Sequence, residues 1–115
     1  MSKILIVEDE ESIRRVLKKI LSEEDKSHEI VEAENGIEAL NFIKKNQLDL
    51  IISDIKMPKV DGIEVLAYVK NNNPDVPVIM ISGHGDLDLA VDCMKKGAYD
   101  YISKPPDLNL SLIHI

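Results

Sequence analysis

Residues 50–54 have the sequence LIISD, in which three large apolar residues are followed by a serine and an acid. Residues 78–82, VIMIS, have the same form and end on a hydroxyl. Apolar runs without polar alternation are typical of strands that are buried on both faces. The two stretches therefore predict a sheet that is covered by helices on both sides.

Similar short runs recur along the chain, at residues 4–7, 30–33, 50–53, 76–81 and 99–102. Between them lie segments whose apolar residues follow the spacing of an amphipathic helix. These are Ile13, Val16, Leu17, Ile20 and Leu21, then Val65, Leu66 and Val69, then Leu87, Ala90, Val91 and Met94. Short strands that alternate with helices predict βαβ units. The fold class is therefore α/β, with a doubly wound five-stranded parallel sheet in a single domain.

Polar residues mark where several of these helices should begin and end. Asn35 and Asp61 each precede a helical segment and have a glutamate three residues later, which is close to a capping box. Asp86 is placed to cap the helix that follows it. Gly97 comes directly after two lysines, as a glycine does beyond the negative end of a helix.

Net charge and composition limit the kinds of molecule that this protein is expected to bind. The net charge is −7, and the basic residues form no cluster longer than a pair, so direct binding to nucleic acid or to a membrane is not expected. Cys93 is the sole cysteine of the sequence, which excludes an internal disulfide and fits a reducing compartment. We therefore expect a cytoplasmic domain whose partner is a cation or another protein.

The ends of the predicted strands carry the residues that point to chemistry. Ligands bind at the carboxyl ends of strands in open α/β sheets, and these ends hold Glu8, Asp9, Asp54, Ser82 and Lys104. Three carboxylates that lie close together repel one another unless a cation lies among them. Oxygen ligands that leave room for waters suit Mg²⁺. The pattern therefore predicts a magnesium site at one edge of the sheet.

The same cluster suggests a covalent step. Asp54 is the natural carboxylate nucleophile and would form an aspartyl-phosphate. Lys104 would neutralise the phosphoryl oxygens, and Ser82 would donate a hydrogen bond to one of them. The plainer interpretation is that single acids in loops are caps or solvated charges, and Asp9 in particular could cap the first helix. Acids at two strand ends, with a serine and a lysine at two others, favour the site.

At these residues the chain resembles the receiver domains of response regulators, the CheY-like superfamily of two-component signalling. The resemblance extends from residue 3 to about residue 107. It rests on IVEDE at 6–10, DIKMP at 54–58 with DG at 61–62, ISG at 81–83 and YISKP at 101–105. It implies a flavodoxin-like fold and a phosphorelay switch, in which Asp54 accepts a phosphoryl group from a sensor histidine kinase in a Mg²⁺-dependent reaction.

The resemblance also implies how the metal is held. Glu8 and Asp9 match the family's acidic pair, which binds Mg²⁺ directly or through water. Asp54 matches the phosphoacceptor, which is also a metal ligand. Lys56 matches the position whose main-chain carbonyl completes the site. Glu8 replaces the more usual aspartate and should keep metal binding with altered reach.

Three further residues match the parts of the family that respond to phosphorylation. Ser82 matches the residue that follows the phosphoryl group on activation. Tyr101 matches the aromatic residue that turns inward with it. Lys104 matches the family's lysine, and its bond to Pro105 is expected to be cis. The surface that rearranges is formed by the predicted helix at 87–96, the strand at 99–102 and the segment that follows. Such a domain is a phosphoacceptor switch rather than an enzyme, although it assists its own phosphorylation and dephosphorylation.

Residues 80–86, MISGHGD, and 94–100, MKKGAYD, resemble the receivers of NtrC-like transcriptional activators. Those proteins carry an AAA+ ATPase and a DNA-binding domain downstream, so the output is expected to be transcriptional. The receiver domain is expected at residues 1–107. Residues 108–115, LNLSLIHI, are too short for the long amphipathic fifth helix of the family. We interpret them as a remnant of that helix or an added tail, and expect the uncovered sheet to favour a homodimer.

Two other functions use similar residues. A Mg²⁺-dependent phosphohydrolase of the haloacid-dehalogenase type places a second aspartate two residues after the nucleophile, where this chain has Lys56. A stand-alone receiver or pseudo-receiver would act as an interaction module, but pseudo-receivers typically lack part of the set of acids, hydroxyl and lysine. The sequence therefore favours the phosphorylation switch.

Overall fold

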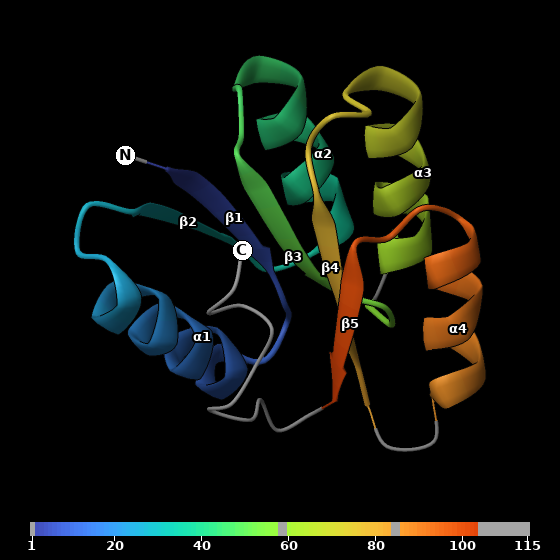
Figure 1. The fold of residues 1–115 in the computed structure, drawn as a ribbon, viewed down its shortest axis with the longest axis horizontal. Helices are drawn as coiled ribbons and strands as arrows, with labels where there is room; N and C mark the ends of the chain where they lie inside the picture. The colour runs from blue at the N-terminus through green and yellow to red at the C-terminus, as the bar shows by residue number, and fades with distance from the viewer. Residues whose placement is uncertain (1, 58–59, 84–85, 104–115) are drawn as a thin grey trace.

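The computed structural model of the 115-residue chain describes residues 2–57, 60–83 and 86–103. Within these ranges its elements are β1 (Lys3–Val7), α1 (Glu11–Glu24), β2 (Glu29–Ala33), α2 (Gly36–Lys45), β3 (Leu50–Asp54), α3 (Gly62–Asn72), β4 (Val78–Ser82), α4 (Leu87–Lys95) and β5 (Asp100–Ser103). The strands form one parallel sheet in the order β2-β1-β3-β4-β5 (Figure 1). The predicted α/β class and the parallel sheet are confirmed.

Helices cover both faces of this sheet, as the apolar runs predict. Figure 1 shows α1 on one side, and α2, α3 and α4 on the other. Alternate residues of each strand supply the two cores. Ile4 and Ile6 of β1 pack with Leu17 of α1, whereas Leu5 and Val7 belong to the core beneath α2, α3 and α4. The central strands are therefore buried on both faces, and they hold their carboxyl ends at fixed positions.

The predicted helix starts at Asn35 and Asp61 are confirmed. The Asn35 side chain accepts a hydrogen bond of 2.9 Å from the Glu38 N–H, and the Asp61 carboxylate accepts one of 3.0 Å from the Glu64 N–H. Each bond satisfies one of the donors that a helix leaves open at its start. Gly97 follows α4 with a φ of 105°, a conformation that glycine adopts without steric cost.

The structure corrects two expectations about the helices. Asp86 stands at the start of α4, but its side chain makes no capping hydrogen bond there; one of its carboxylate oxygens pairs with the Lys56 ammonium at 2.9 Å. Several apolar positions of the predicted helical stripes are exposed, namely Val16, Leu87, Val91 and Met94. The helix α4 lies at the edge of the sheet and buries a narrow face of small residues, Ala90 and Cys93. Its larger apolar side chains therefore extend beyond the area that the sheet covers.

Gly62 lets the start of α3 approach the end of β3. A Cβ atom on Gly62 would lie 2.0 Å from the main-chain oxygen of Asp54. The Gly62 N–H also donates a hydrogen bond of 2.8 Å to the Ile55 carbonyl. The main chain of Asp54 and Ile55 is therefore packed directly against the first turn of α3, and this contact leaves no room for a side chain at position 62.

Several predictions lie outside the described residues. These are the position of Lys104, the geometry of its bond to Pro105, and the fate of residues 108–115. The domain boundary at residue 107 stays a prediction for the same reason. In the part of the chain that the structure describes, no helix combines the length and apolar character needed to cross a lipid bilayer.

We expect the substitution Gly62→Ala to lower the free energy of unfolding by about 1–3 kcal/mol, the usual cost of overpacking. The added methyl group meets a main-chain oxygen that cannot move without displacing the end of β3. Denaturant unfolding followed by circular dichroism measures the change. Gly83→Ala is the matched control, because its added methyl meets the movable Asp86 carboxylate at 3.1 Å. Equal stability of the two variants would show that the approach at Gly62 is not a constraint.

Candidate functional site

The register of the sheet brings the carboxyl ends of four strands to one edge. Val7 pairs with Ser53, so the following residues, Glu8 and Asp54, leave neighbouring strands side by side. Asp54 in turn pairs with Ile81 of β4, and Ser82 pairs with the last residue of β5. Residues that are far apart in the sequence therefore meet here because parallel strands end at the same edge.

Buried polar side chains gather at this edge. Among the described residues, the polar or charged residues that are buried are Glu8, Arg14, Ser53, Asp54 and Ser82. All of them lie at the ends of β1, β3 and β4 or in the first turns of α1. Burial of a carboxylate is costly unless other groups compensate for the lost water. Within the described residues, the buried polar groups are therefore concentrated at this edge of the sheet.

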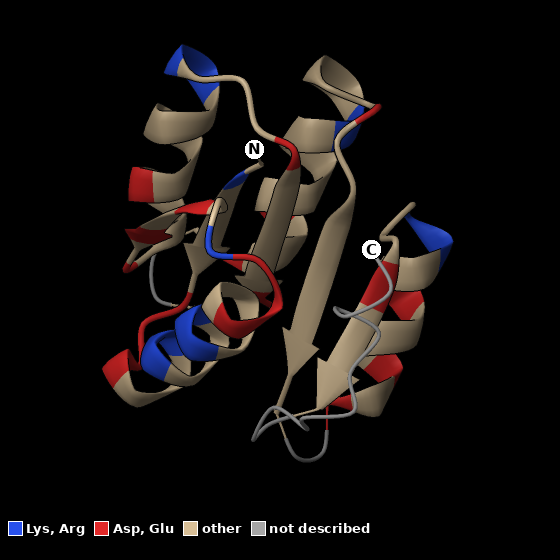
Figure 2. Ribbon diagram, turned by 60° about the vertical axis from the view of Figure 1, so that its left-hand side comes forward, with Lys and Arg blue, Asp and Glu red and all other residues tan. Residues whose placement is uncertain are grey.

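An acidic turn connects β1 to α1, and Figure 2 shows it as a continuous red stretch that leads into the helix. Carboxylate oxygens of Glu8, Asp9 and Glu10 all lie within 4.8 Å of one another. Glu8 is buried, whereas Asp9 and Glu10 are exposed. Sequence reasoning assigned no role to Glu10, although the run of three acids was the signal that could have identified it. Asp54 is not a member of this close group.

The structure decides whether Asp9 is merely a helix cap. The residue at the capping position of α1 is Glu10, and its side chain makes no capping hydrogen bond. Asp9 lies one residue earlier, with its side chain exposed. The interpretation of Asp9 as a cap is therefore wrong, and its carboxylate stays available to the acidic turn.

Asp54 is the last residue of β3 and is 3% exposed. The Ser53 hydroxyl donates a hydrogen bond of 3.0 Å to the Asp54 carbonyl. The next residue, Ile55, donates its N–H to the Ile81 carbonyl of β4 at 3.1 Å. The main chain is thus held on both sides of Asp54, at the end of the strand that neighbours the one leading into the acidic turn.

The other predicted residues differ in their burial and in their contacts. The Ser82 hydroxyl is buried and donates a hydrogen bond of 3.4 Å to the Ile102 carbonyl of β5. Tyr101 is partly buried and packs against the core beneath α4. Lys56 is exposed, and its ion pair with Asp86 joins the loop after β3 to the start of α4. Lys104 follows β5 directly but lies outside the described residues.

Comparison with known proteins identifies the family. Residues 4–114 match the response regulator receiver domain. The chain belongs to this family. The chemotaxis protein CheY of Listeria monocytogenes is 41% identical over 105 residues, which are 91% of this chain and 87% of CheY. The DNA-binding transcriptional regulator NtrC of Escherichia coli is 38% identical over 106 residues, which are 92% of this chain and 22% of that protein. The receiver domain therefore spans about a fifth of the NtrC relatives that it matches.

Solved structures of receiver domains agree with this assignment. A response regulator receiver domain protein from Clostridium thermocellum has a TM-score of 0.86 at 37% identity, and the match covers 98% of this chain and 90% of that one. The receiver domain of NtrX from Brucella abortus has a TM-score of 0.84 at 39% identity, with coverage of 92% and 88%. The fold of this chain is therefore the receiver fold throughout the described residues.

The donor set at the edge of the receiver sheet fits a hard divalent cation. The acidic turn offers carboxylate oxygens alone, from one buried and two exposed residues. Carboxylate ligands that keep part of their contact with water are what Mg²⁺ prefers, whereas softer metals favour sulfur and imidazole. The described residues of the turn contain neither of those groups.

Two other features of the receiver lie apart from this edge. Cys93 is fully buried in α4, and burial raises the pKa of its thiol, which keeps it neutral and unreactive.

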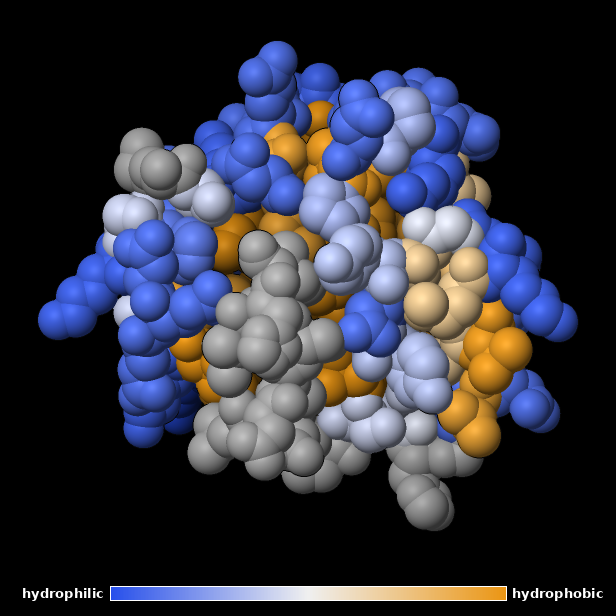
Figure 3. Space-filling view, viewed as in Figure 1, coloured by the Kyte–Doolittle hydropathy of each residue, from blue (hydrophilic) through white to orange (hydrophobic). Residues whose placement is uncertain are grey.

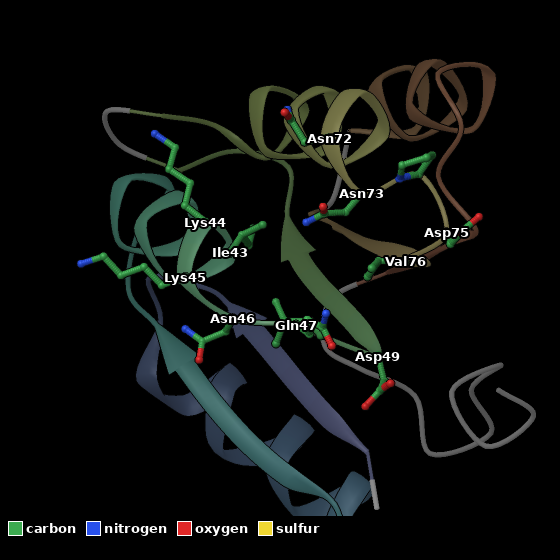
Figure 4. Close-up of a pocket in the computed structure, with 12 residues that line it drawn as sticks. Ile43, Lys44, Lys45, Asn46, Gln47, Asp49, Asn72, Asn73, Asp75 and Val76 are labelled. Carbon is green, nitrogen blue, oxygen red and sulfur yellow. The ribbon is translucent and has the colours of Figure 1, made fainter.

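A cavity of about 760 Å³ lies between the ends of α2 and α3, at the opposite edge of the sheet. Figure 4 shows amide side chains such as Asn46, Gln47 and Asn73 around it, together with acidic ones. None of the predicted site residues lines this cavity.

Proposed function

We propose that this receiver domain accepts a phosphoryl group on Asp54 from a sensor histidine kinase. The observation that supports this most directly is the burial of two carboxylates, Glu8 and Asp54, side by side where parallel strands end. A protein that required stability alone would have placed apolar residues there. The family membership supports the same role, because Asp54 occupies the position that matches the phosphoacceptor.

The proposed reaction is a transfer between two side chains. A carboxylate oxygen of Asp54 attacks the phosphorus atom of a phosphohistidine on the kinase. The bond between phosphorus and nitrogen breaks, and its electron pair returns to the imidazole, which takes up a proton. Lys104 and Ser82 then neutralise and hydrogen-bond the oxygens of the new aspartyl-phosphate. The other residues form no covalent bond in this transfer. Their role is to place charges that stabilise the phosphoryl oxygens.

The residues that would hold Mg²⁺ are Glu8, Asp9 and Asp54, with the main-chain carbonyl of Lys56. When bound, the ion would offset the repulsion among the carboxylates and the incoming phosphoryl oxygens. Glu10 lies close enough to Asp9 to take part, directly or through a water. The role of the chain itself is to hold these oxygens together before the donor arrives.

The response to phosphorylation is proposed to pass through Ser82 to the surface of α4 and β5. The Ser82 hydroxyl donates a long hydrogen bond of 3.4 Å to the Ile102 carbonyl. A phosphoryl oxygen on Asp54 could replace that carbonyl as the acceptor. Tyr101 lies next to Ile102 and would follow this movement. The surface beyond it carries exposed Leu87, Val91, Met94 and Tyr99. Figure 3 shows apolar side chains at the surface over α4, which is suited to contact with a partner or a second copy.

The rest of the signalling protein is proposed from its longer relatives. One of these is named as a DNA-binding transcriptional regulator, and the present chain matches a fifth of its length. Structures of NtrX are described as complexes with ADP and with ATP. We propose that this receiver controls an output domain of the same kind, an ATPase coupled to DNA binding. Contact with DNA would then be made by that output domain and not by the receiver.

We expect Asp54→Asn to abolish phosphorylation by acetyl phosphate in the presence of Mg²⁺, because an amide of the same shape cannot attack phosphorus. Intact-protein mass spectrometry measures the added phosphate on the wild type and on the variant. Asp75→Asn, on an acid at the opposite edge of the sheet, is the matched control and should be phosphorylated like the wild type. A phosphate added to the Asp54→Asn variant would place the acceptor elsewhere. Sustained release of inorganic phosphate would indicate a phosphohydrolase instead of a switch.

We expect Mg²⁺ to bind with a dissociation constant on the order of millimolar, since a site of few carboxylates and several waters is weak. Asp9→Asn should weaken binding, because it removes the charge of one ligand. Titration followed by NMR of the amides in the acidic turn measures both constants. Glu23→Gln, on an exposed acid at the far end of α1, should leave the constant unchanged. An equal effect of the two substitutions would mean that overall charge, not ligation, attracts the ion.

We expect phosphorylation to increase self-association through the exposed apolar residues of α4. The double substitution Leu87→Ser and Val91→Ser should abolish that increase without loss of phosphorylation, because both side chains are largely exposed. Light scattering across a concentration series measures the mass with and without acetyl phosphate. Val16→Ser, on an exposed apolar residue of α1, is the matched control. Self-association that survives the double substitution would exclude this surface.

A further inference from the structure

Arg14 is buried beside the acidic turn, although arginine is rarely buried without a specific partner. It lies in α1, four residues after Glu10, on the face that also carries Leu17 and Leu21. Its guanidinium reaches back to the strand that precedes the helix. We propose that Arg14 is a positioning residue that holds the acidic turn in the arrangement that binds Mg²⁺. This inference rests on the proposed function, because it assigns a role toward the same metal.

One contact carries the proposal. The Nη1 atom of Arg14 donates a hydrogen bond of 2.7 Å to the main-chain oxygen of Glu8. The distance is short for an N–H to carbonyl bond and agrees with a charged donor. Glu8 is fully buried, so its carbonyl oxygen cannot turn to water. A buried carbonyl that has left the strand ladder needs another donor, and Arg14 supplies it.

The guanidinium also anchors to the neighbouring strand. Its Nε atom lies 3.3 Å from the Glu32 carboxylate of β2, and Nη2 lies 3.9 Å from Glu34. The Glu8 N–H donates a hydrogen bond of 3.0 Å to the Ala33 carbonyl, at the end of the same strand. Glu8 is therefore held by β2 at its N–H and by Arg14 at its carbonyl, and Arg14 itself contacts β2 through Glu32.

The orientation of that peptide determines where the acids point. The Glu8 carboxylate accepts a hydrogen bond of 3.0 Å from the Glu10 N–H, which closes the turn. Asp9 lies between these two residues, so its carboxylate leaves the chain in a direction that the turn defines. Without Arg14 the turn would sample other conformations, and metal binding would then have to order it at a cost in conformational entropy.

Charge alone predicts the opposite effect. Arg14 places a positive charge near the cation site, and Coulomb repulsion from it would weaken the binding of Mg²⁺. If charge dominated, removal of Arg14 would tighten binding. If positioning dominates, the same substitution weakens binding. The sign of the change therefore separates the two roles.

Lys18 provides a matched comparison on the same helix. Its ammonium also lies near the Glu32 carboxylate, at 3.7 Å, but its side chain is 53% exposed. Lys18 lies one helical turn beyond Arg14 in α1, farther along the helix from the acidic turn. Removal of Lys18 therefore takes away one positive charge and one ion pair with Glu32, and leaves the acidic turn intact.

The test compares Arg14→Met, Arg14→Lys and Lys18→Met with the wild type. NMR titration of the amides of Asp9 and Glu10 gives the Mg²⁺ dissociation constant of each folded protein. We expect Arg14→Met to raise the constant about tenfold, as loss of a residue that orients metal ligands does. Arg14→Lys keeps the charge but loses the fork of donors, so it should fall between Arg14→Met and the wild type. Lys18→Met should change the constant less than about twofold, because an exposed charge is screened by salt.

Melting temperatures without metal separate positioning from stability. A purely structural Arg14 would lower the melting temperature and leave the dissociation constant of the folded protein unchanged, which would overturn the proposal. Tighter binding by Arg14→Met would overturn it in favour of charge. If Arg14→Met fails to fold, Arg14→Lys decides the matter, and a wild-type constant in that variant would overturn the proposal. Failure of the wild type itself to bind Mg²⁺ would refute the proposed metal site, a result distinct from equal binding by wild type and variants.

Discussion

The burial of Glu8 and Asp54 at adjoining strand ends is the constraint on which the rest of this receiver depends. Two carboxylates in that position repel each other and have lost much of their contact with water. The two acids stay close together because β1 and β3 are neighbours in the sheet. Helices cover both strands, so neither strand end can move away from the other. The site is thus a product of the sheet order: acids that are 46 residues apart along the chain meet because two parallel strands end together.

The surrounding loops connect this pair of acids to the surface. Gly62 brings the start of α3 against the Asp54 carbonyl, and the ion pair between Lys56 and Asp86 joins the loop after β3 to α4. Under the proposed function, a phosphoryl group on Asp54 would act first on the start of α3, which already approaches the Asp54 main chain. The exposed apolar residues of α4 lie on the helix that this ion pair reaches, and under the proposed function they are the surface that would respond. Coupling through packed elements of this kind needs no long-range force.

Much of the fold could be predicted because its signals are local. Apolar runs located all five strands to within two residues at each end, and the helix starts at Asn35 and Asp61 followed from the spacing of an acceptor and a glutamate. The errors arose where a neighbouring element competed for the same side chain. Asp86 has the right residue type for a cap, but Lys56, thirty residues earlier, engages its carboxylate. Val91 has helical spacing, but α4 lies at the edge of the sheet, where too little surface remains to cover it.

The sequence by itself determined the order of the elements, the parallel sheet and the set of acids and hydroxyl at the strand ends, because each follows from residue type and spacing within a few positions. The acidic turn was visible in the same way, as three consecutive acids, although the closeness of Glu10 was overlooked. The burial of Arg14 and its contacts could be seen only in the tertiary structure. By its type, an arginine in a helix is expected at the surface, and its burial depends on the Glu8 carbonyl and on Glu32 of another strand. Contacts of this kind have no signature in the sequence, because they form only when the sheet has brought β1, β2 and α1 together.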